Sequence, residues 1–377
     1  MKLIRDPLYR IIEIEDEFLP IIDNPYFQRL RFIKQDANIF YLYPSSKQDR
    51  FSHSLGAYHL MKQVVNNQVL KLTKTQKFNL KAAALLHDIG HGAYSHTWEK
   101  LRSDFDHEKI SSEIIRKIFK LPEVAKIIEK KSPFYPLISS VIDVDKMDYM
   151  ARDSYFSGVG YGVTDLDRIV TYLGVKDKKI TIVPKIVTSV EHVIIGRISL
   201  FKSMYFHHTI IAKDEILVNI FKRVHDLYKN KKTPFLDPLL EKMLYKDFEL
   251  NDFLDFNDST VEFHLDKWRT AEDPILRDLV TRYLTREGFL ALDLEHYNID
   301  INKIKKEIAK KFPLKYYYCV ETRGKQLYQS EAMIKINSKL VPLSEFSEHI
   351  KKIKDMNINK KFLIGPKEIL KKYKTKF

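Results

Sequence analysis

A stretch of thirteen residues, HDIGHGAYSHTWE from His87 to Glu99, most constrains what this chain can fold into. It holds three histidines, two carboxylates and two glycines, and it follows an apolar run, Phe78–Leu86, whose apolar positions have helical spacing. Adjacent ionisable groups at the end of a buried helix are rare unless something pairs with them. We therefore expect a helix that bends at the glycines, with a metal ion as the partner of His87 and Asp88.

The composition indicates a globular protein with a large core, since 44% of its 377 residues are apolar and 30% are charged. No apolar run approaches the roughly 20 residues that span a bilayer, and the first residues, MKLIRDPLYR, lack the apolar core of a signal peptide. One cysteine, Cys319, excludes an internal disulfide framework and a thiolate-rich zinc site. We expect a cytoplasmic protein that makes no membrane contact.

The net charge of +14 is concentrated near the C-terminus, where residues 301–377 hold 20 Lys and Arg against 7 Asp and Glu. A basic segment of this kind can bind nucleic acid or another polyanion. The alternative is a solvated lysine-rich surface with no ligand. Under either interpretation we expect the chemistry to reside upstream of this segment.

The hydrophobic pattern predicts a mainly α fold, with helices over residues 52–70, 107–119 and 137–153 and a long helix over residues 188–217. The segment IFYLYP, residues 39–44, is expected to be a short strand. Strand and helix patterns alternate in the last eighty residues. We therefore predict a helical domain over residues 1–290 and a smaller, basic α+β domain over residues 291–377.

Two histidines and two carboxylates can be nominated as metal ligands, although each residue alone is more typical of a helix cap or a solvated surface. They come from three predicted helices, so a shared ion would join those helices: His53, His87, Asp88 and Asp145. This mixed nitrogen and oxygen set suits Fe, Mn, Zn or Ni. Four protein ligands leave coordination positions for water and phosphate oxygens, as a catalytic ion requires.

Three segments carry a resemblance to a known family: RFSHSLGAYHL at residues 50–60, HDIGHGAYSH at residues 87–96 and DVDKMDYMARD at residues 143–153. They resemble the signature blocks of HD-domain phosphohydrolases. With PYFQRLRFIKQ at residues 25–35, they are similar to the deoxynucleoside triphosphate triphosphohydrolases related to the human SAM-and-HD-domain protein and to bacterial dGTPases. The resemblance covers about residues 1–215, and we expect no SAM domain.

The resemblance implies a role for each matching residue. The four nominated ligands would bind the metal, and Mg²⁺ would accompany the substrate phosphates. An acid/base group near the α-phosphate would comprise His91, Glu99 and His107, and His96 would protonate the departing 5′-oxygen. The residues that match substrate-binding positions for triphosphate, sugar or base are Gln35, Asp36, Arg50, Lys146, Tyr149, Asp153, Arg197 and Tyr205.

Three positions depart from the family pattern. Asp36 replaces a leucine that packs against the sugar, Phe206 replaces a glutamine near the base, and Glu99 replaces an aspartate. A carboxylate at position 36 can accept a hydrogen bond from a ribose hydroxyl, which predicts weaker selection against ribonucleotides. In the alternative interpretation, Asp36 faces solvent and pairs with Lys34 or a neighbouring arginine.

The function implied is metal-dependent hydrolysis of a (deoxy)nucleoside triphosphate, in which water attacks the α-phosphorus and releases the nucleoside and inorganic triphosphate. A second enzymatic interpretation keeps the site but takes a nucleoside monophosphate or a signalling nucleotide. A third is a nucleotide-responsive protein that binds nucleic acid through its basic C-terminal segment. A homo-oligomer is expected.

Overall fold

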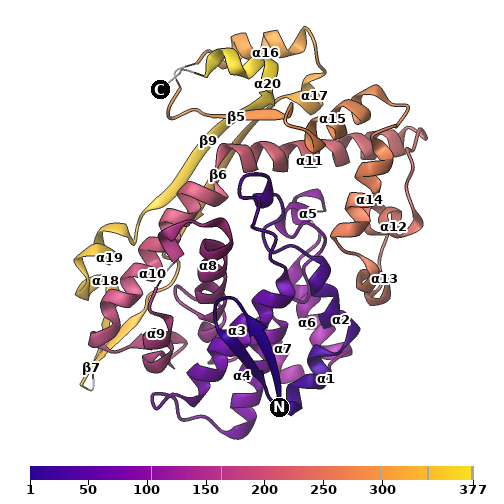
Figure 1. Ribbon diagram of the computed structural model, residues 1–377. Helices are drawn as coiled ribbons and strands as arrows, with labels where there is room; N and C mark the ends of the chain where they lie inside the picture. Colours follow the sequence, from indigo (N-terminus) through magenta and orange to yellow (C-terminus); the bar gives the residue numbers. More distant parts are fainter. Residues whose placement is uncertain (103, 163, 298, 338, 375–377) are drawn as a thin grey trace.

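The helices that carry the expected polar cluster lie in the first half of the chain, in a computed structural model that describes residues 1–102, 104–162, 164–297, 299–337 and 339–374. A β-hairpin opens the chain, β1 (Lys2–Asp6) and β2 (Arg10–Ile14). The helices that follow are α1 (Leu19–Ile22), α2 (Pro25–Gln28), α3 (Arg50–Asn66), α4 (Lys74–Leu86), α5 (His96–Leu101), α6 (His107–Lys117), α7 (Pro122–Ile128), α8 (Val144–Ser157) and α9 (Leu166–Tyr172). Figure 1 shows α3, α4 and α8 side by side in this part of the molecule.

Local sequence explains where these helices begin. Asp49 caps α3 by accepting a hydrogen bond from the Ser52 amide, and Asp143 caps α8 in the same way through the Lys146 amide. A capping box between Thr73 and Gln76 starts α4. Short polar side chains therefore fix the entry of the three helices that meet at the polar cluster.

Helices α3 and α8 approach each other closely because residue 56 is a glycine. A Cβ atom at Gly56 would lie 1.8 Å from Oδ1 of Asp148 and 2.5 Å from Nη2 of Arg152. Any side chain at position 56 would therefore push α8 away from α3 and separate the residues that the two helices present to each other.

The middle of the chain is helical, as the pattern predicts, but the long helix expected over residues 188–217 is interrupted. It consists of α10 (Val187–Leu200), a π-helical turn (Phe201–Tyr205) and α11 (His208–Lys229), whose N-cap is His207. Apolar periodicity cannot detect one extra residue in a turn. The helices after this break are α12 (Pro238–Tyr245), α13 (Leu250–Asp255), α14 (Asp258–Trp268) and α15 (Pro274–Leu284).

Strands and short helices alternate towards the C-terminus, as expected for an α+β segment. The helices are α16 (Ile301–Ala309), α17 (Leu314–Tyr317), α18 (Leu343–Phe346), α19 (Glu348–Ile353) and α20 (Lys367–Leu370). The strands are β5 (Phe289–Asp293), β6 (Cys319–Gln326), β7 (Met333–Ile336), β8 (Lys339–Pro342) and β9 (Asn357–Pro366). Strand β9 lies between β5 and β6 in an antiparallel sheet and runs from the region of α18 and α19 towards α16 and α11 (Figure 1).

A second sheet connects the C-terminal segment to the upstream helices. Its strand order is β3 (Gly174–Lys176), β4 (Lys179–Ile182), β7 and β8, and β7 pairs with β4 in parallel. The C-terminal strands therefore add to structure that begins before residue 290. The division of the chain into domains at residue 290 stays a prediction.

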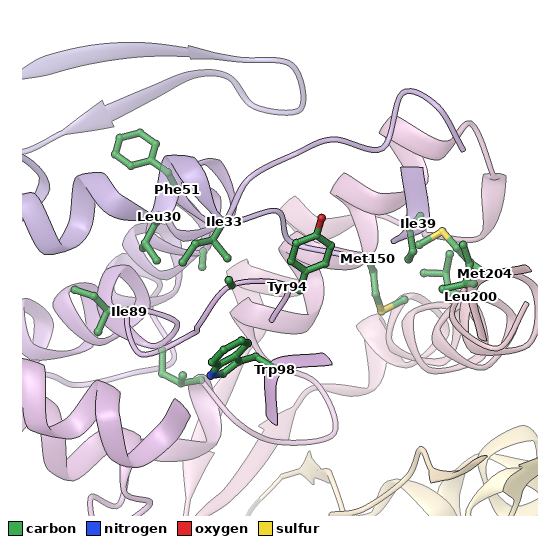
Figure 2. Packing of buried hydrophobic residues seen from close by; sticks show 14 of the residues in the cluster. Leu30, Ile33, Ile39, Phe51, Ile89, Tyr94, Trp98, Met150, Leu200 and Met204 are labelled. Atoms are coloured by element: carbon green, nitrogen blue, oxygen red, sulfur yellow. The ribbon is translucent and has the colours of Figure 1, made fainter. Parts of the chain in front are cut away.

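The hydrophobic core extends through the helical part of the chain. Figure 2 shows Phe51, Ile89 and Met150, which come from separate stretches of sequence, within one buried cluster. The mainly α fold with a smaller α+β segment is confirmed. The strand expected at IFYLYP is wrong, since residues Ile39–Tyr41 form a 3-10 turn with Ile39 buried. Among the described residues, no helix has the length and apolar character needed to cross a membrane.

Candidate active site

The four nominated metal ligands, His53, His87, Asp88 and Asp145, lie together and are called here the metal cluster. His53 comes from the first turn of α3, His87 and Asp88 from the end of α4, and Asp145 from the first turn of α8. Nε2 of His53 lies 3.2 Å from Nε2 of His87 and 3.2 Å from Oδ1 of Asp145. Oδ1 of Asp145 is 3.6 Å from Nε2 of His87, and Asp88 is 3.5–3.6 Å from both imidazoles.

The ring orientations in the metal cluster fit a bound cation. Nδ1 of His53 lies 2.7 Å from Oδ2 of Asp148, and Nδ1 of His87 lies 2.9 Å from the carbonyl oxygen of Ala84. Each Nδ1 therefore donates outward, which leaves two Nε2 lone pairs facing each other inside the cluster. Two imidazole lone pairs at this distance repel each other unless a proton or a metal ion lies between them.

The electrostatics of the metal cluster agree with this geometry. Burial alone would lower the pKa of His53, but the carboxylates of Asp145 and Asp148 raise it to about 10. Burial opposes ionisation of Asp145 as well, but its hydrogen bonds to His53 and His87 hold the pKa of its carboxyl well below the usual range. The cluster therefore attracts positive charge, and a divalent ion can replace the protons that the imidazoles otherwise retain.

Asp148 was not nominated from the sequence, although it supports His53 directly. It is fully buried and accepts hydrogen bonds from Nε and Nη2 of Arg152, each at 3.0 Å, and from the hydroxyl of Tyr9 at 2.8 Å. Arg152 also donates to Asp6 at 3.0 Å. A buried network that reaches the N-terminal hairpin therefore fixes the tautomer and orientation of one metal-cluster imidazole.

A second group, His91, His96, Glu99 and His107, adjoins the metal cluster and is called here the histidine–glutamate cluster. Glu99 hydrogen-bonds to His107 through one carboxylate oxygen, and its other oxygen lies 2.9 Å from Nδ1 of His96. The rings of His91 and His107 stack with centroids 4.0 Å apart. The sequence pattern therefore brings together the residues expected to act as acids and bases.

The members of this second cluster differ in protonation and exposure. Burial, together with the positive charges of Arg50 and His107, holds the pKa of His91 well below its usual range, so this ring is neutral. Burial would raise the pKa of Glu99, but its hydrogen bonds to His107 and His96 hold it well below the usual range. The side chain of His96 is 70% exposed, so it can meet a ligand that arrives from solvent.

The turn between His91 and His96, within the histidine–glutamate cluster, is strained. Tyr94 and Ser95 have positive φ values of 56° and 51°, which residues other than glycine rarely adopt. The Tyr94 amide donates to Asp258 at 2.8 Å, and Oγ of Ser95 accepts from Nε of Arg50 at 3.0 Å. These contacts hold the backbone in a conformation that places His91 and His96 on the same side of the metal cluster.

The candidate sugar-binding residues form a connected network. Nε2 of Gln48 lies 2.8 Å from Oδ1 of Asp153 and 3.2 Å from Oδ2 of Asp36, and the hydroxyl of Tyr205 donates to Asp153. Burial raises the pKa of both carboxyls, and for Asp153 the charge of Asp36 adds to this rise. The two carboxyls, called here the carboxyl pair, therefore retain a proton more readily than an isolated aspartate does.

Asp36 is partly exposed and accepts a hydrogen bond from Gln48, and the pairing with Lys34 that the alternative interpretation expects is not seen among the described residues. Nζ of Lys34 pairs instead with Glu262 at 2.7 Å and with Asp258 at 3.5 Å. Gln35 lies next to Asp36, and its side-chain oxygen is buried without a partner among the described residues. An acceptor of this kind is available to a hydroxyl group of a ligand.

The candidate phosphate-binding residues bring positive charge to the site. Arg50 hydrogen-bonds to Asp88 and lies beside the metal cluster, with 3% of its surface exposed. Lys146 pairs with Asp143 at 2.7 Å, and Nε of Arg197 donates to the hydroxyl of Tyr149 at 3.1 Å. These contacts position three cations around one side of the site.

Sequence reasoning did not nominate Gln48, Asp148 or Lys325, which contact or adjoin these groups. Asp148 and Arg152 are four residues apart on one helix, a spacing that allows an ion pair. The same spacing is common on solvent-exposed helix surfaces, so it is only a weak indication of a buried pair. Lys325 lies 180 residues downstream of Asp145, a nominated metal ligand, in β6. No local pattern relates it to the site.

The chain is similar to several known proteins over the region that holds these residues. Residues 50–153 match the family model of the HD domain. The uncharacterized protein YwfO of Bacillus subtilis is 32% identical over 315 residues, which are 76% of this chain and 71% of that protein. Human deoxynucleoside triphosphate triphosphohydrolase SAMHD1 is 30% identical over 211 residues, 42% of this chain and 34% of that protein. The crystal structure of a phosphohydrolase from Bacteroides thetaiotaomicron has a TM-score of 0.88 at 26% identity and covers 97% of this chain and 99% of that chain.

Proposed function

The chain belongs to the HD-domain phosphohydrolases, which are metal-dependent hydrolases, and we propose that its substrate is a nucleoside triphosphate, in the deoxy or the ribo form. Water attacks the α-phosphorus, the bond from that phosphorus to the 5′-oxygen breaks, and the nucleoside and inorganic triphosphate leave. The similarity to a deoxynucleoside triphosphate triphosphohydrolase supports this choice of substrate.

The position of Asp88 carries the proposal. Its Oδ1 atom lies 3.5 Å from Nε2 of His87 in the metal cluster and 3.4 Å from Nε2 of His91 in the histidine–glutamate cluster. One carboxylate therefore joins a cation-binding group to a group of titratable side chains. A phosphoryl group beside Asp88 is within reach of both, as metal-assisted hydrolysis requires.

The metal cluster would hold a divalent ion such as Fe, Mn, Zn or Ni, and Mg²⁺ would accompany the substrate phosphates. The bound ion supplies Lewis-acid polarisation of the phosphoryl oxygens and favours hydroxide over water. Two imidazoles and two carboxylates provide the donor set. Which of these metals the cluster prefers is a question for metal analysis of the purified protein.

The chain's own residues account for the proton transfers. His91 is neutral, and its Nδ1 has no partner among the described residues, so it can accept a hydrogen bond from the attacking water. His96 donates from Nδ1 to Glu99, so in its doubly protonated, cationic form it can deliver the second proton from Nε2 to the 5′-oxygen and becomes neutral. An alkoxide leaves poorly without that proton, so this step assists the cleavage.

Cationic and polar groups around the site would orient the substrate. The positive charges of Arg50, Lys146 and Arg197 complement the charges of a triphosphate, which carries about four negative charges. The carboxyl pair, Gln35 and Tyr205 would contact the sugar hydroxyls. The phosphate end of the substrate would therefore contact cations, and the sugar end would contact the carboxyl pair and neutral polar groups.

The test is incubation of the purified protein with each dNTP and NTP in the presence of Mn²⁺, in water enriched in ¹⁸O. We expect nucleoside and inorganic triphosphate, with the label in the triphosphate, because the attacked phosphorus stays with that product. Release of pyrophosphate or orthophosphate from the same substrates would contradict the proposal. Hydrolysis of nucleoside monophosphates or signalling nucleotides alone would indicate the other enzymatic function.

Two expected partners stay predictions. A homo-oligomer can be tested by light scattering. Nucleic-acid binding by the basic segment has no support in the contacts of that segment, since several of its cations pair with carboxylates. Examples are Lys315 with Asp226, Lys360 with Asp293 and Arg323 with Asp214.

A further inference from the structure

A third cation, Lys325, lies beside Lys146 and Arg197. Nη1 of Arg197 donates to the carbonyl oxygen of Leu327 at 3.1 Å, which anchors the end of β6 to α10. The guanidinium carbon of Arg197 and Nζ of Lys325 lie 5.6 Å and 5.9 Å from the centroid of the Phe201 ring. Strand β6 therefore brings a side chain of the C-terminal segment to the candidate phosphate-binding residues.

Lys325 is a partly buried lysine of the C-terminal segment, whereas Lys335 of the same segment is exposed. Lys315, Lys360, Lys367 and Lys372 each pair with a carboxylate within 4.0 Å. No carboxylate of the described residues comes this close to Lys325, although its side chain is half-buried. Burial, followed by the positive charges of Arg197 and Lys146, lowers the pKa of Lys325.

Three cations held close together cost free energy in the absence of an anion. Lys146 is partly compensated by Asp143. Among the described residues, the hydrogen bonds of Arg197 go to the neutral acceptors of Tyr149 and Leu327, although the charges of Asp143 and Asp145 act on it from further away, and Lys325 has no carboxylate partner. Such like-charge crowding is typical of sites that bind a multiply charged anion. The metal cluster is adjacent, because Asp145 and Lys146 are consecutive residues in α8.

We propose that Lys325 completes a site for the polyphosphate tail of the substrate, together with Lys146 and Arg197. The inference rests on the proposed function for the identity of the substrate, and it adds that the C-terminal segment contributes a binding residue to the active site. A substrate with a single phosphate would carry too little negative charge to compensate both the metal cluster and these three cations. Substrates with an extended, highly charged phosphate chain are therefore the class that the site selects.

The test measures binding of inorganic triphosphate by isothermal titration calorimetry, in wild type, Lys325→Gln, Lys325→Arg and Lys335→Gln. Lys335 is an exposed lysine on β7 and is the matched control. We expect Lys325→Gln to weaken triphosphate binding about 5- to 10-fold, as for the loss of one charge-assisted contact. Lys325→Arg should restore most of the affinity, and Lys335→Gln should leave it unchanged.

A purely structural role for Lys325 would give a different result. Without triphosphate, Lys325→Gln should unfold at the same temperature as wild type or a higher one, because the substitution removes like-charge repulsion. The rise in unfolding temperature on adding triphosphate should be smaller in this variant. Wild-type affinity in Lys325→Gln, or equal losses in Lys325→Gln and Lys335→Gln, would overturn the inference.

The outcome does not depend on turnover. If the wild type hydrolyses no nucleoside triphosphate but binds inorganic triphosphate through Lys325, the proposed function fails and the polyphosphate site stands. If turnover is observed and Lys325→Gln leaves KM for the triphosphate unchanged, the proposed function stands and the role of Lys325 fails. In the expected case, KM rises and kcat changes less.

Discussion

Oδ2 of Asp148 lies 2.7 Å from Nδ1 of His53, on the side of the imidazole that faces away from the metal cluster. Asp148 is itself held by Arg152 and Tyr9, so its position is set by two other parts of the chain. A carboxylate in this position makes the opposite nitrogen, Nε2, the one available to a metal ion and increases its basicity. The geometry of the metal cluster therefore depends on residues outside it.

The substitution Asp148→Asn should weaken metal binding 10- to 100-fold, about the range seen when such a supporting group is lost. It should also lower the free energy of unfolding by roughly 3–5 kcal/mol, because Arg152 loses one of two buried carboxylate partners. Metal titration of the folded apo-protein measures the first effect. Tyr9→Phe, which removes one hydrogen bond to Asp148, should cost about 1 kcal/mol of stability and leave metal affinity within about 3-fold. Unchanged affinity in Asp148→Asn would contradict the supporting role.

Asp145→Ala should abolish hydrolysis and greatly reduce bound metal, because one of four expected ligands is lost. The fold should persist, since the core of α8 is formed by Val144, Met147 and Met150. Asp167→Ala, at an exposed carboxylate on α9, is the control and should behave as wild type. Full metal occupancy in Asp145→Ala would exclude Asp145 as a ligand.

Asp36→Leu should raise the ratio of kcat/KM for dATP over ATP about 3- to 10-fold, the value of one hydrogen bond to a ribose hydroxyl. Leucine at this position offers no acceptor, whereas Asp36→Asn keeps a carbonyl oxygen and should change the ratio less. Guanine nucleotides should follow the same trend. An unchanged ratio in Asp36→Leu would show that Asp36 has no part in sugar selection.

The free energy of unfolding should fall as the pH falls from about 6.5 to about 4, in part through His207. Burial and the positive charges of His208, Lys374 and Lys360 lower the pKa of His207 to about 4. In this interval the unfolded chain binds a proton that the folded chain does not, so protonation favours unfolding. Nδ1 of His207 also accepts the capping hydrogen bond from the Thr209 amide, which a protonated ring would lose.

His207→Asn tests whether protonation of His207 contributes to the loss of stability at low pH, because asparagine caps helices but does not titrate. The loss of stability between pH 6.5 and pH 4 should be about 1–2 kcal/mol smaller in this variant, after allowance for solvent screening of a half-exposed ring. Chemical denaturation at several pH values gives the comparison. Parallel pH curves for the two proteins would contradict the assignment to His207.

Truncation after Asp300 should destabilise the chain and remove most activity, in contrast to the independence that the sequence pattern suggests for the C-terminal segment. It would remove β9, the partner of β5, and Lys325. Solubility, thermal unfolding and turnover of the truncated chain provide the measurement. A soluble truncation with wild-type turnover would restore the view that all chemistry resides upstream.

Leu363→Ala tests the contribution of β9 to the core without removing the segment. Leu363 is fully buried, so the substitution should cost about 2–5 kcal/mol of stability. Lys361→Ala, at an exposed position of the same strand, is its control and should change stability by less than about 0.5 kcal/mol. Equal effects of the two substitutions would show that β9 is not part of the core.

The mainly α fold, the family and the short-range chemistry can be predicted from local patterns of the sequence. His87 and Asp88 are adjacent, and their apolar helix ends in a turn that includes His91, so local periodicity indicates one polar site. Each of these inferences uses residues within one or two helical turns, where backbone geometry fixes the neighbours.

Only the tertiary structure decided which distant residues complete the site. Asp148 reaches His53 because Gly56 lets α8 approach α3. Gln48 joins its near neighbour Asp36 to Asp153, which lies 105 residues after Gln48, and β6 brings Lys325 to Arg197. The interruption of the long helix before α11, at His207, and the pairing of β4 with β7 likewise do not follow from local sequence patterns. Such contacts depend on how buried surfaces fit together, and hydrophobic periodicity identifies which face of an element is buried without specifying its partner.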